Sequence, residues 1–248
     1  MAVDDVVCGC VDALGPQAGD IARTAWLAAG LPEAIPGTTI DRQCGSGQQA
    51  ISFAAMGVWA GVQDLVVAGG VQNMSMVPIG LALEAAAPLG HEDPFSGSTG
   101  WVDRYGLQEV TQFRGAEMIA EKWDLSREAM EAFAFESHRR AVVAIDEGRF
   151  DNEVVPLAGE TADEGPRREV SMERMADLPP LVEGGWLTAA LASQISDGAA
   201  ALLVASERAV ADHGLTPRAC RNWPAGPSFG IAPAGLMWSV VTECPSLS

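Results

Sequence analysis

Short apolar runs of strand length alternate with amphipathic stretches of helical period through the first 70 residues. The apolar runs are residues 3–11, 38–40 and 64–70, and the helical stretches are residues 20–30 and the segment that ends near Ala60. Such alternation favours a buried sheet covered by helices, because each strand is apolar on both faces. We therefore predict an α/β fold.

Beyond residue 78 the chain consists of segments that differ in composition and in expected secondary structure. Residues 78–108 are rich in Pro and Gly and are expected to be loop. Two helices are expected at about 109–123 and 127–147. Residues 151–185 indicate loop, 193–204 a buried strand and 207–213 a short helix. Residues 219–248 keep neither a helical nor a strand period. This predicts a core over 1–78, an insertion over 79–186, a return to the core over 187–218 and a separate tail over 219–248.

Charge and cysteine content exclude several function classes. The formal net charge of −18 argues against nucleic-acid binding, which needs a basic face. The sequence has no apolar run long enough to span a bilayer and no signal-peptide pattern after Met1, so we expect no membrane partner. Five cysteines, an odd number, favour a reducing cytoplasm. Cys8 and Cys10 lack the spacing of metal ligands, so packed thiols and no metal site are expected.

Cys44 stands where a strand ends and a helix begins. Unpaired backbone N–H groups and the helix dipole favour a thiolate at such a point. Gly45 and Gly47 would let a bulky thioester approach the backbone, and the Cys44 N–H would face a developing oxyanion. The alternative from local pattern alone is an ordinary buried thiol.

The residues around Cys44 carry a family resemblance. The run Asp41-Arg-Gln-Cys-Gly-Ser-Gly-Gln-Gln-Ala50 resembles the nucleophile loop of thiolases, and Gly69-Gly-Val-Gln-Asn-Met-Ser75 resembles their second signature. The resemblance continues in the runs 126–128, 133–141, 147–151 and 193–201 and covers residues 3 to about 218. It implies a thiolase-like fold, here as an incomplete N-terminal half with an inserted loop domain.

The resemblance also implies an activity and a set of roles. Cys44 takes the acyl group, Ser193 lies by the pantetheine arm of coenzyme A, and Arg167 lies near its nucleotide end. Acyl groups would pass between a 3-ketoacyl-CoA or acetyl-CoA and coenzyme A, in fatty-acid or sterol side-chain degradation. Coenzyme A is then a substrate, no cofactor is expected, and self-association as a dimer or tetramer is implied.

Two departures from the family pattern bear on this expectation. Gln72 stands where the second signature usually carries Glu, which removes a charge but keeps a hydrogen-bonding side chain. The His-Met pair of some short-chain thiolases is absent around Thr111 to Arg114, and that region is more similar to thiolases of bulky or sterol-derived acyl chains. His91, His138 and His213 are expected to be surface or capping residues.

The ends of the chain leave alternatives open. The motifs of a thiolase's second half, including its histidine and second cysteine, are absent, and Cys220 and Cys244 match neither. The first strand is also expected to be missing, and a frameshift or premature stop is a hypothesis for the tail. An incompetent remnant and a half that works with a separate partner are therefore alternatives to an active enzyme. Ketoacyl synthases are a weaker alternative, because their nucleophile cysteine has a different context.

Overall fold

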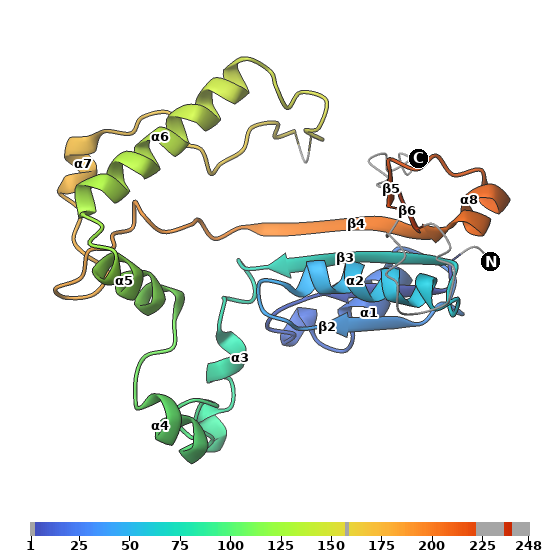
Figure 1. Ribbon diagram of the computed structural model, residues 1–248, viewed down its shortest axis with the longest axis horizontal. Coiled ribbons are helices and arrows are strands. Elements are labelled where there is room, and N and C mark those ends of the chain that lie inside the picture. The colour runs from blue at the N-terminus through green and yellow to red at the C-terminus, as the bar shows by residue number, and fades with distance from the viewer. Residues whose placement is uncertain (1–2, 157–158, 222–235, 240–248) are drawn as a thin grey trace, which may run out of the picture. The chain divides into compact units, whose positions relative to one another are not determined.

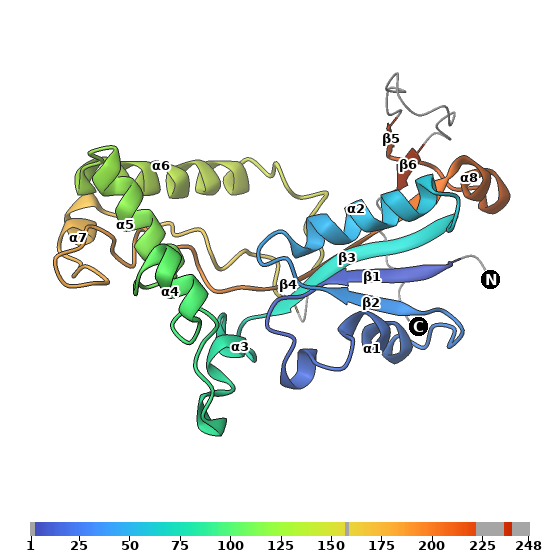
Figure 2. The same cartoon turned by 60° about the horizontal axis from the view of Figure 1, so that its bottom comes forward.

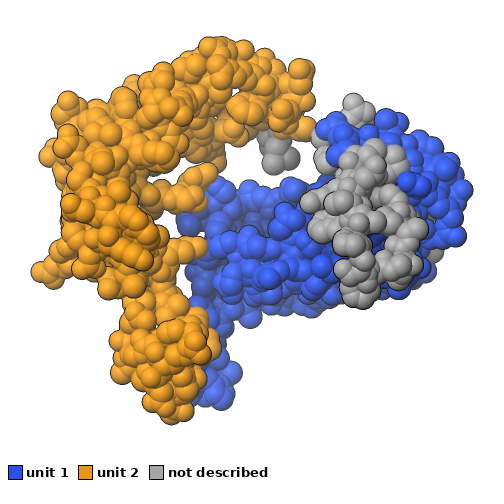
Figure 3. All heavy atoms as spheres, viewed as in Figure 1, with its two compact units in different colours: residues 1–93, 195–248 blue, residues 94–194 orange. Residues whose placement is uncertain are grey.

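The computed structural model describes residues 3–156, 159–221 and 236–239. The chain divides into two compact units, which Figure 3 shows in different colours. The first unit comprises residues 1–93 and 195–248, and the second comprises residues 94–194. The domain limits expected from the sequence, at 78/79 and 186/187, remain a prediction.

A six-stranded mixed sheet forms the first unit. Its strands lie in the order β2-β1-β3-β4-β6-β5, and β1 pairs in parallel with both β2 and β3. The β3–β4, β4–β6 and β6–β5 pairs are antiparallel. The strands are β1 Asp5–Gly9, β2 Gly37–Ile40, β3 Leu65–Asn73, β4 Asp197–Ser206, β5 Ala219–Arg221 and β6 Leu236–Ser239.

Helices cover both faces of this sheet, as Figures 1 and 2 show. Along β1, Val7 points into a core with Ala54 and Val58 of helix α2 (Ser46–Trp59). Val6 points to the opposite face, where it packs with Ala22 of helix α1 (Ile21–Ala28). Because successive strand side chains alternate between faces, one apolar strand supplies both cores. The expected α/β class is therefore observed.

Among the described residues, four shorter elements also belong to the first unit. They are η1 Gly15–Gln17, α3 Leu81–Glu84, η2 Ala87–Leu89 and α8 Glu207–His213. Helix α8 packs behind the end of β4, where Leu65, Ala205 and Ala209 form a small buried cluster. Its N-terminus is capped by Ser206, whose side chain accepts a hydrogen bond from the Ala209 amide at 3.1 Å.

The described part of the second unit consists of helices and the segments that connect them. The helices are α4 Thr99–Tyr105, α5 Gln112–Lys122, α6 Arg127–Asp146 and α7 Met172–Ala176. Arg127 joins α6 to α7: it pairs with the buried Glu131 at 2.7 Å and donates to the carbonyls of Met175, Ala176 and Leu178. The Met175 carbonyl also accepts from the Leu178 amide at 3.2 Å. Arg127 thus adds side-chain donors at the end of a short helix, where the last carbonyls have few intrahelical partners.

Several local expectations are corrected by the structure. Helices α3, α4 and α7 lie in segments expected to be loop, because helices of one or two turns are too short to show a 3.6-residue period. α4 and α7 begin at serine caps, Ser98 and Ser171. The expectation that 219–248 holds no strand is wrong at β5 and β6, which pair through backbone hydrogen bonds beside β4. The rest of that tail lies outside the described residues.

Among the described residues, no helix has the length and apolar character needed to cross a membrane.

Candidate active site

The segment that carries Cys44 is a tight loop between β2 and α2. Gln43 adopts a left-handed conformation with φ of 51°. The side chain of Ser46 closes the loop, because its Oγ accepts from the Arg42 amide at 2.8 Å and donates to the Gln43 carbonyl at 2.5 Å. The amide of Gly45 donates to the Arg42 carbonyl at 3.1 Å. Cys44 therefore lies on a loop held by its own neighbours, directly before the first turn of a 14-residue helix.

Exposure distinguishes Cys44 from the other two cysteines whose side chains the structure describes. Cys44 is exposed, whereas Cys8 is half-buried and Cys10 is buried. Burial raises the pKa of the Cys8 thiol to about 11 and also raises that of Cys10. Both stay protonated near neutral pH, as expected for packed thiols. The reading of Cys44 as an ordinary buried thiol does not fit its exposure.

Glycines let the start of α2 lie directly on the sheet. A Cβ added at Gly9 would lie 2.4 Å from the Gly47 nitrogen and from the Ser46 carbonyl carbon. A Cβ at Gly70 would lie 3.5 Å from the Gly47 Cα. The absence of a side chain at Gly9 therefore sets how closely the helix start approaches β1, whereas a Cβ at Gly70 would make only ordinary contact with it. Gly47 serves this packing, and its predicted role in thioester approach remains a prediction.

Polar side chains tie the loop after β1 to the end of β3. Gln72 Oε1 accepts from the Val11 amide at 3.1 Å, and Gln17 Oε1 accepts from the Asn73 amide at 2.7 Å. The buried Asp12 carboxylate accepts from the Gly80 and Ala82 amides at 2.9 and 2.8 Å. Gln72 thus keeps a hydrogen-bonding role where the family pattern has Glu, although its Nε2 is buried with no hydrogen-bond partner among the described residues.

The turn of the second signature is fixed by the start of β4. Asp197 accepts from the Ser75 amide at 2.9 Å and from its hydroxyl at 2.6 Å. These hydrogen bonds, led by that of the Ser75 hydroxyl, lower the pKa of Asp197. Asn73 closes the same turn by accepting from the Met76 amide at 3.0 Å. The two signature motifs are therefore both in the first unit: polar contacts between near neighbours hold the first, and the second also has partners distant in the sequence.

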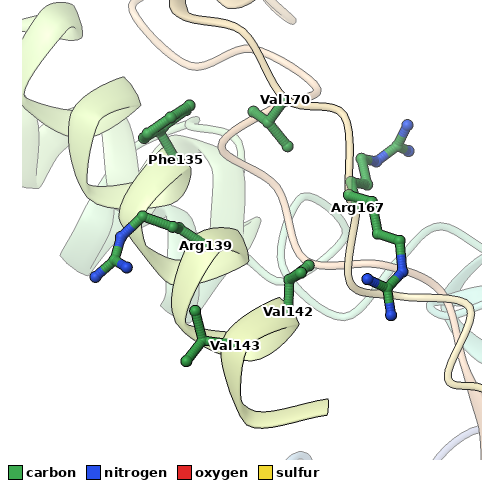
Figure 4. Close-up of a pocket in the computed structure, with 7 residues that line it drawn as sticks. Phe135, Arg139, Val142, Val143, Arg167 and Val170 are labelled. Atoms are coloured by element: carbon green, nitrogen blue, oxygen red, sulfur yellow. The ribbon is translucent and has the colours of Figure 1, made fainter. Parts of the chain in front are cut away.

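The two predicted coenzyme A residues lie on neighbouring segments of the second unit. Ser193 and Arg167 are both exposed. Their segments meet where the Gln194 side-chain nitrogen lies 3.3 Å from the position of a Cβ at Gly165. Arg167 lines a hollow of about 150 Å³ between α6 and residues 167–170, which Figure 4 shows. Its other lining residues are Phe135, Arg139, Val142, Val143, Arg168 and Val170.

The histidines and acidic residues show no metal-binding cluster in the part of the chain that the structure describes. His213 lies in the last turn of α8, where a basic side chain complements the helix dipole. His138 on α6 accepts at Nδ1 from the Arg167 amide at 3.2 Å. His91 is exposed after η2. His91 and His213 have the surface or capping environment that the sequence predicted, whereas His138 is half-buried within α6.

Sequence reasoning missed Gly9 and three carboxylates that accept hydrogen bonds from backbone amides. These are Asp12, Asp197 and Glu117, the last of which accepts from the Leu187 amide at 2.9 Å. A glycine inside an apolar strand run is a recognised sign of close backbone approach, so Gly9 offered a usable signal. The carboxylates offered none, because their partners are backbone amides distant in the sequence.

Comparison with known proteins places this arrangement in a family. Residues 1–208 match the family model described as the N-terminal domain of thiolase. Steroid 3-ketoacyl-CoA thiolase FadA6 of Mycobacterium tuberculosis is 60% identical over 222 residues, which cover 88% of this chain and 54% of that protein. The 3-oxoadipyl-CoA/3-oxo-5,6-dehydrosuberyl-CoA thiolase of Escherichia coli is 38% identical, covering 88% of this chain and 58% of its own.

A solved structure shows the same fold. The acetyl-CoA acetyltransferase of Bacillus anthracis matches with a TM-score of 0.64 and 33% sequence identity, covering 87% of this chain and 57% of that one. The chain thus spans little more than half the length of these relatives. The resemblance inferred from the two signature motifs is confirmed, and so is the thiolase-like fold: the chain belongs to the thiolase family.

Proposed function

We propose that this chain is the nucleophile-bearing part of a thiolase, in which Cys44 accepts an acyl group from a coenzyme A thioester. The observation that carries this proposal is the exposure of Cys44 on a fixed loop at the start of α2. The first-turn N–H groups of a helix, together with its dipole, stabilise negative charge. They would stabilise the oxyanion that forms when the Cys44 sulfur attacks a carbonyl.

The chemical step is a thioester exchange. The Cys44 sulfur attacks the acyl carbonyl, the tetrahedral intermediate collapses, and the bond from carbon to the coenzyme A sulfur breaks. The Cys44 proton passes to the departing thiolate, so free coenzyme A leaves as a thiol. With a 3-ketoacyl-CoA the attack falls on the keto carbon, and the broken bond joins that carbon to C2, which leaves as the enolate of acetyl-CoA and takes up a proton.

Coenzyme A itself is assigned to the second unit. Ser193 would contact the pantetheine arm, and Arg167 would approach the phosphates of the nucleotide. The contact between Gly165 and Gln194 supports this assignment, because it brings the two segments together within one unit. Gly45 and Gly47 would leave room for the thioester beside Cys44.

For the acyl group we propose a bulky, steroid-derived 3-ketoacyl-CoA. The 60% identity to a protein named for steroid 3-ketoacyl-CoA well exceeds the 38% identity to one named for 3-oxoadipyl-CoA. Self-association as a dimer or tetramer and a cytoplasmic location complete the proposal, the latter because of the odd cysteine count.

The test is acylation of this chain by acetyl-CoA, followed by intact mass and peptide mapping. The wild type and the Cys8→Ala control should gain one acetyl group on the peptide that contains Cys44. The Cys44→Ala variant should gain none. Equal labelling of Cys44→Ala and wild type would overturn the assignment of the nucleophile, and an unlabelled wild type would overturn the acyl-transfer proposal for this chain.

A further inference from the structure

A buried carboxylate on α5 has backbone amides as its hydrogen-bond partners. Glu117 is 7% exposed, and its Oε1 accepts from the Trp186 amide at 3.1 Å and from the Leu187 amide at 2.9 Å. Its Oε2 also lies 3.1 Å from the Trp186 amide. Burying a charge is costly, and a buried charge is weak grounds for inferring stability. The contacts instead indicate a role in fixing the position of residues 186–187.

Gly185, which has no side chain, leaves the space that this carboxylate occupies. A Cβ at Gly185 would lie 2.5 Å from Glu117 Oε1, a distance that real Cβ atoms do not show. The glycine is therefore a second, independent feature that permits the contact. Its own φ is not in the left-handed region, so an alanine there meets the carboxylate and, at 3.1 Å, the Val182 carbonyl oxygen, without left-handed backbone strain.

The segment held by Glu117 leads directly to Ser193. The Leu181 amide donates to the Leu187 carbonyl at 2.7 Å, and the Leu191 amide donates to the Thr188 carbonyl at 2.9 Å. Thr188 is fully buried. At the other end, Gln194 lies against Gly165. Ser193 is thus presented on a short stretch that is fixed on both sides.

We propose that Glu117 is a positioning residue, which holds the 186–194 segment in the conformation that presents Ser193 to the pantetheine arm of coenzyme A. This inference rests on the proposed coenzyme A role of that segment. Glu117 does not touch the ligand: it acts through the Trp186 and Leu187 amides. Charge-assisted hydrogen bonds to a carboxylate are stronger than those to a neutral amide, so Glu117→Gln should loosen the segment while leaving one acceptor in place.

The experiment measures coenzyme A affinity by titration calorimetry on the full chain. Glu117→Gln and Gly185→Ala should each weaken the affinity about 10-fold, the loss expected from one weakened hydrogen bond to a charged group. Glu121→Gln, on the exposed part of the same helix, makes the same chemical change and should bind as the wild type does. Acetylation of Cys44 by S-phenyl thioacetate, a thioester that has no pantetheine arm, should proceed at the wild-type rate in all variants.

Hydrogen exchange of the Trp186 and Leu187 amides shows whether the positioning role of Glu117 fails separately from the proposed function. Faster exchange of the Trp186 and Leu187 amides in Glu117→Gln, together with weakened affinity, supports the positioning role. Faster exchange with unchanged affinity overturns it, because the segment would then move without consequence for the ligand. Unchanged exchange also overturns it. A wild-type chain that does not bind coenzyme A refutes the underlying proposed function, whatever the variants do.

Discussion

Replacing Gly9 by alanine should displace the start of α2 and destabilise the first unit. The added Cβ would lie 2.4 Å from the Gly47 nitrogen, about 1 Å short of the 3.4 Å at which ordinary contact begins. Both atoms nearest to it, the Gly47 nitrogen and the Ser46 carbonyl carbon, belong to the backbone of the helix start. No side-chain rotation relieves the clash, so strand and helix must separate.

The magnitude follows from the cost of overpacking. Inserting a methyl group into a well-packed region costs about 1–3 kcal/mol, and a backbone clash falls in the upper half of that range. At about 2–4 °C per kcal/mol for a protein of this size, a loss of about 2 kcal/mol lowers the Tm by about 4–8 °C. A displacement of about 1 Å near a reacting group also slows reaction by up to about 100-fold.

The assay compares Gly9→Ala with Gly198→Ala, which is a matched glycine in β4. A Cβ at Gly198 meets nothing within 4 Å, so its replacement should leave both stability and reactivity near the wild-type values. Thermal unfolding gives the Tm, and mass spectrometry follows the rate at which acetyl-CoA acylates Cys44. If Gly9→Ala matches the control in both measurements, the close approach of α2 to β1 does not position Cys44.

Three further predictions concern other parts of the chain. Iodoacetamide at pH 8 should alkylate Cys44 well before Cys8, whose pKa of about 11 leaves roughly one thiol in a thousand ionised, and peptide mapping gives the order. Because the folded-state pKa of Asp197 is lowered, its contribution to stability is present above about pH 4 and lost as the pH falls through that lowered value. Urea unfolding of Asp197→Asn should therefore be less sensitive to acid than that of the wild type. Arg127→Met should cost about 3–5 kcal/mol by leaving Glu131 buried and unpaired, and the double change Arg127→Met with Glu131→Met should recover part of this loss in the same measurement.

The parts of the fold that sequence reasoning predicted are those encoded by local patterns. β1 and β3 were predictable because apolar residues such as Val6, Val7 and Val66 cover both faces of each strand. The Cys44 loop was predictable because a cysteine followed by Gly45 and Gly47 at a strand–helix junction is a local arrangement of residue types. The long helix α6 followed from Ser126, which caps it by accepting from the Ala129 amide at 3.1 Å.

The remainder depends on contacts between residues far apart in the sequence. Gly9 is required because a side chain there would clash with Ser46 and Gly47. The hydrophobic periodicity of the residues around Gly9 does not reveal this contact. Glu117 reads as one polar residue of an amphipathic helix, although its partners are the amides of Trp186 and Leu187. A contact between a carboxylate and a backbone amide cannot be recognised from the sequence of either segment, since a backbone amide is present at every residue except proline.

The first unit is discontinuous, which has a consequence for its synthesis. β3 is translated before the whole of residues 94–194, but its antiparallel partner β4 begins only at Asp197. Until β4 emerges, the nascent chain therefore carries β3 with one edge unpaired, which is an edge open to association with other chains. The second unit is continuous and is complete before that edge closes. Translation that pauses between residues 94 and 194 would thus prolong the interval in which the growing chain is prone to aggregate.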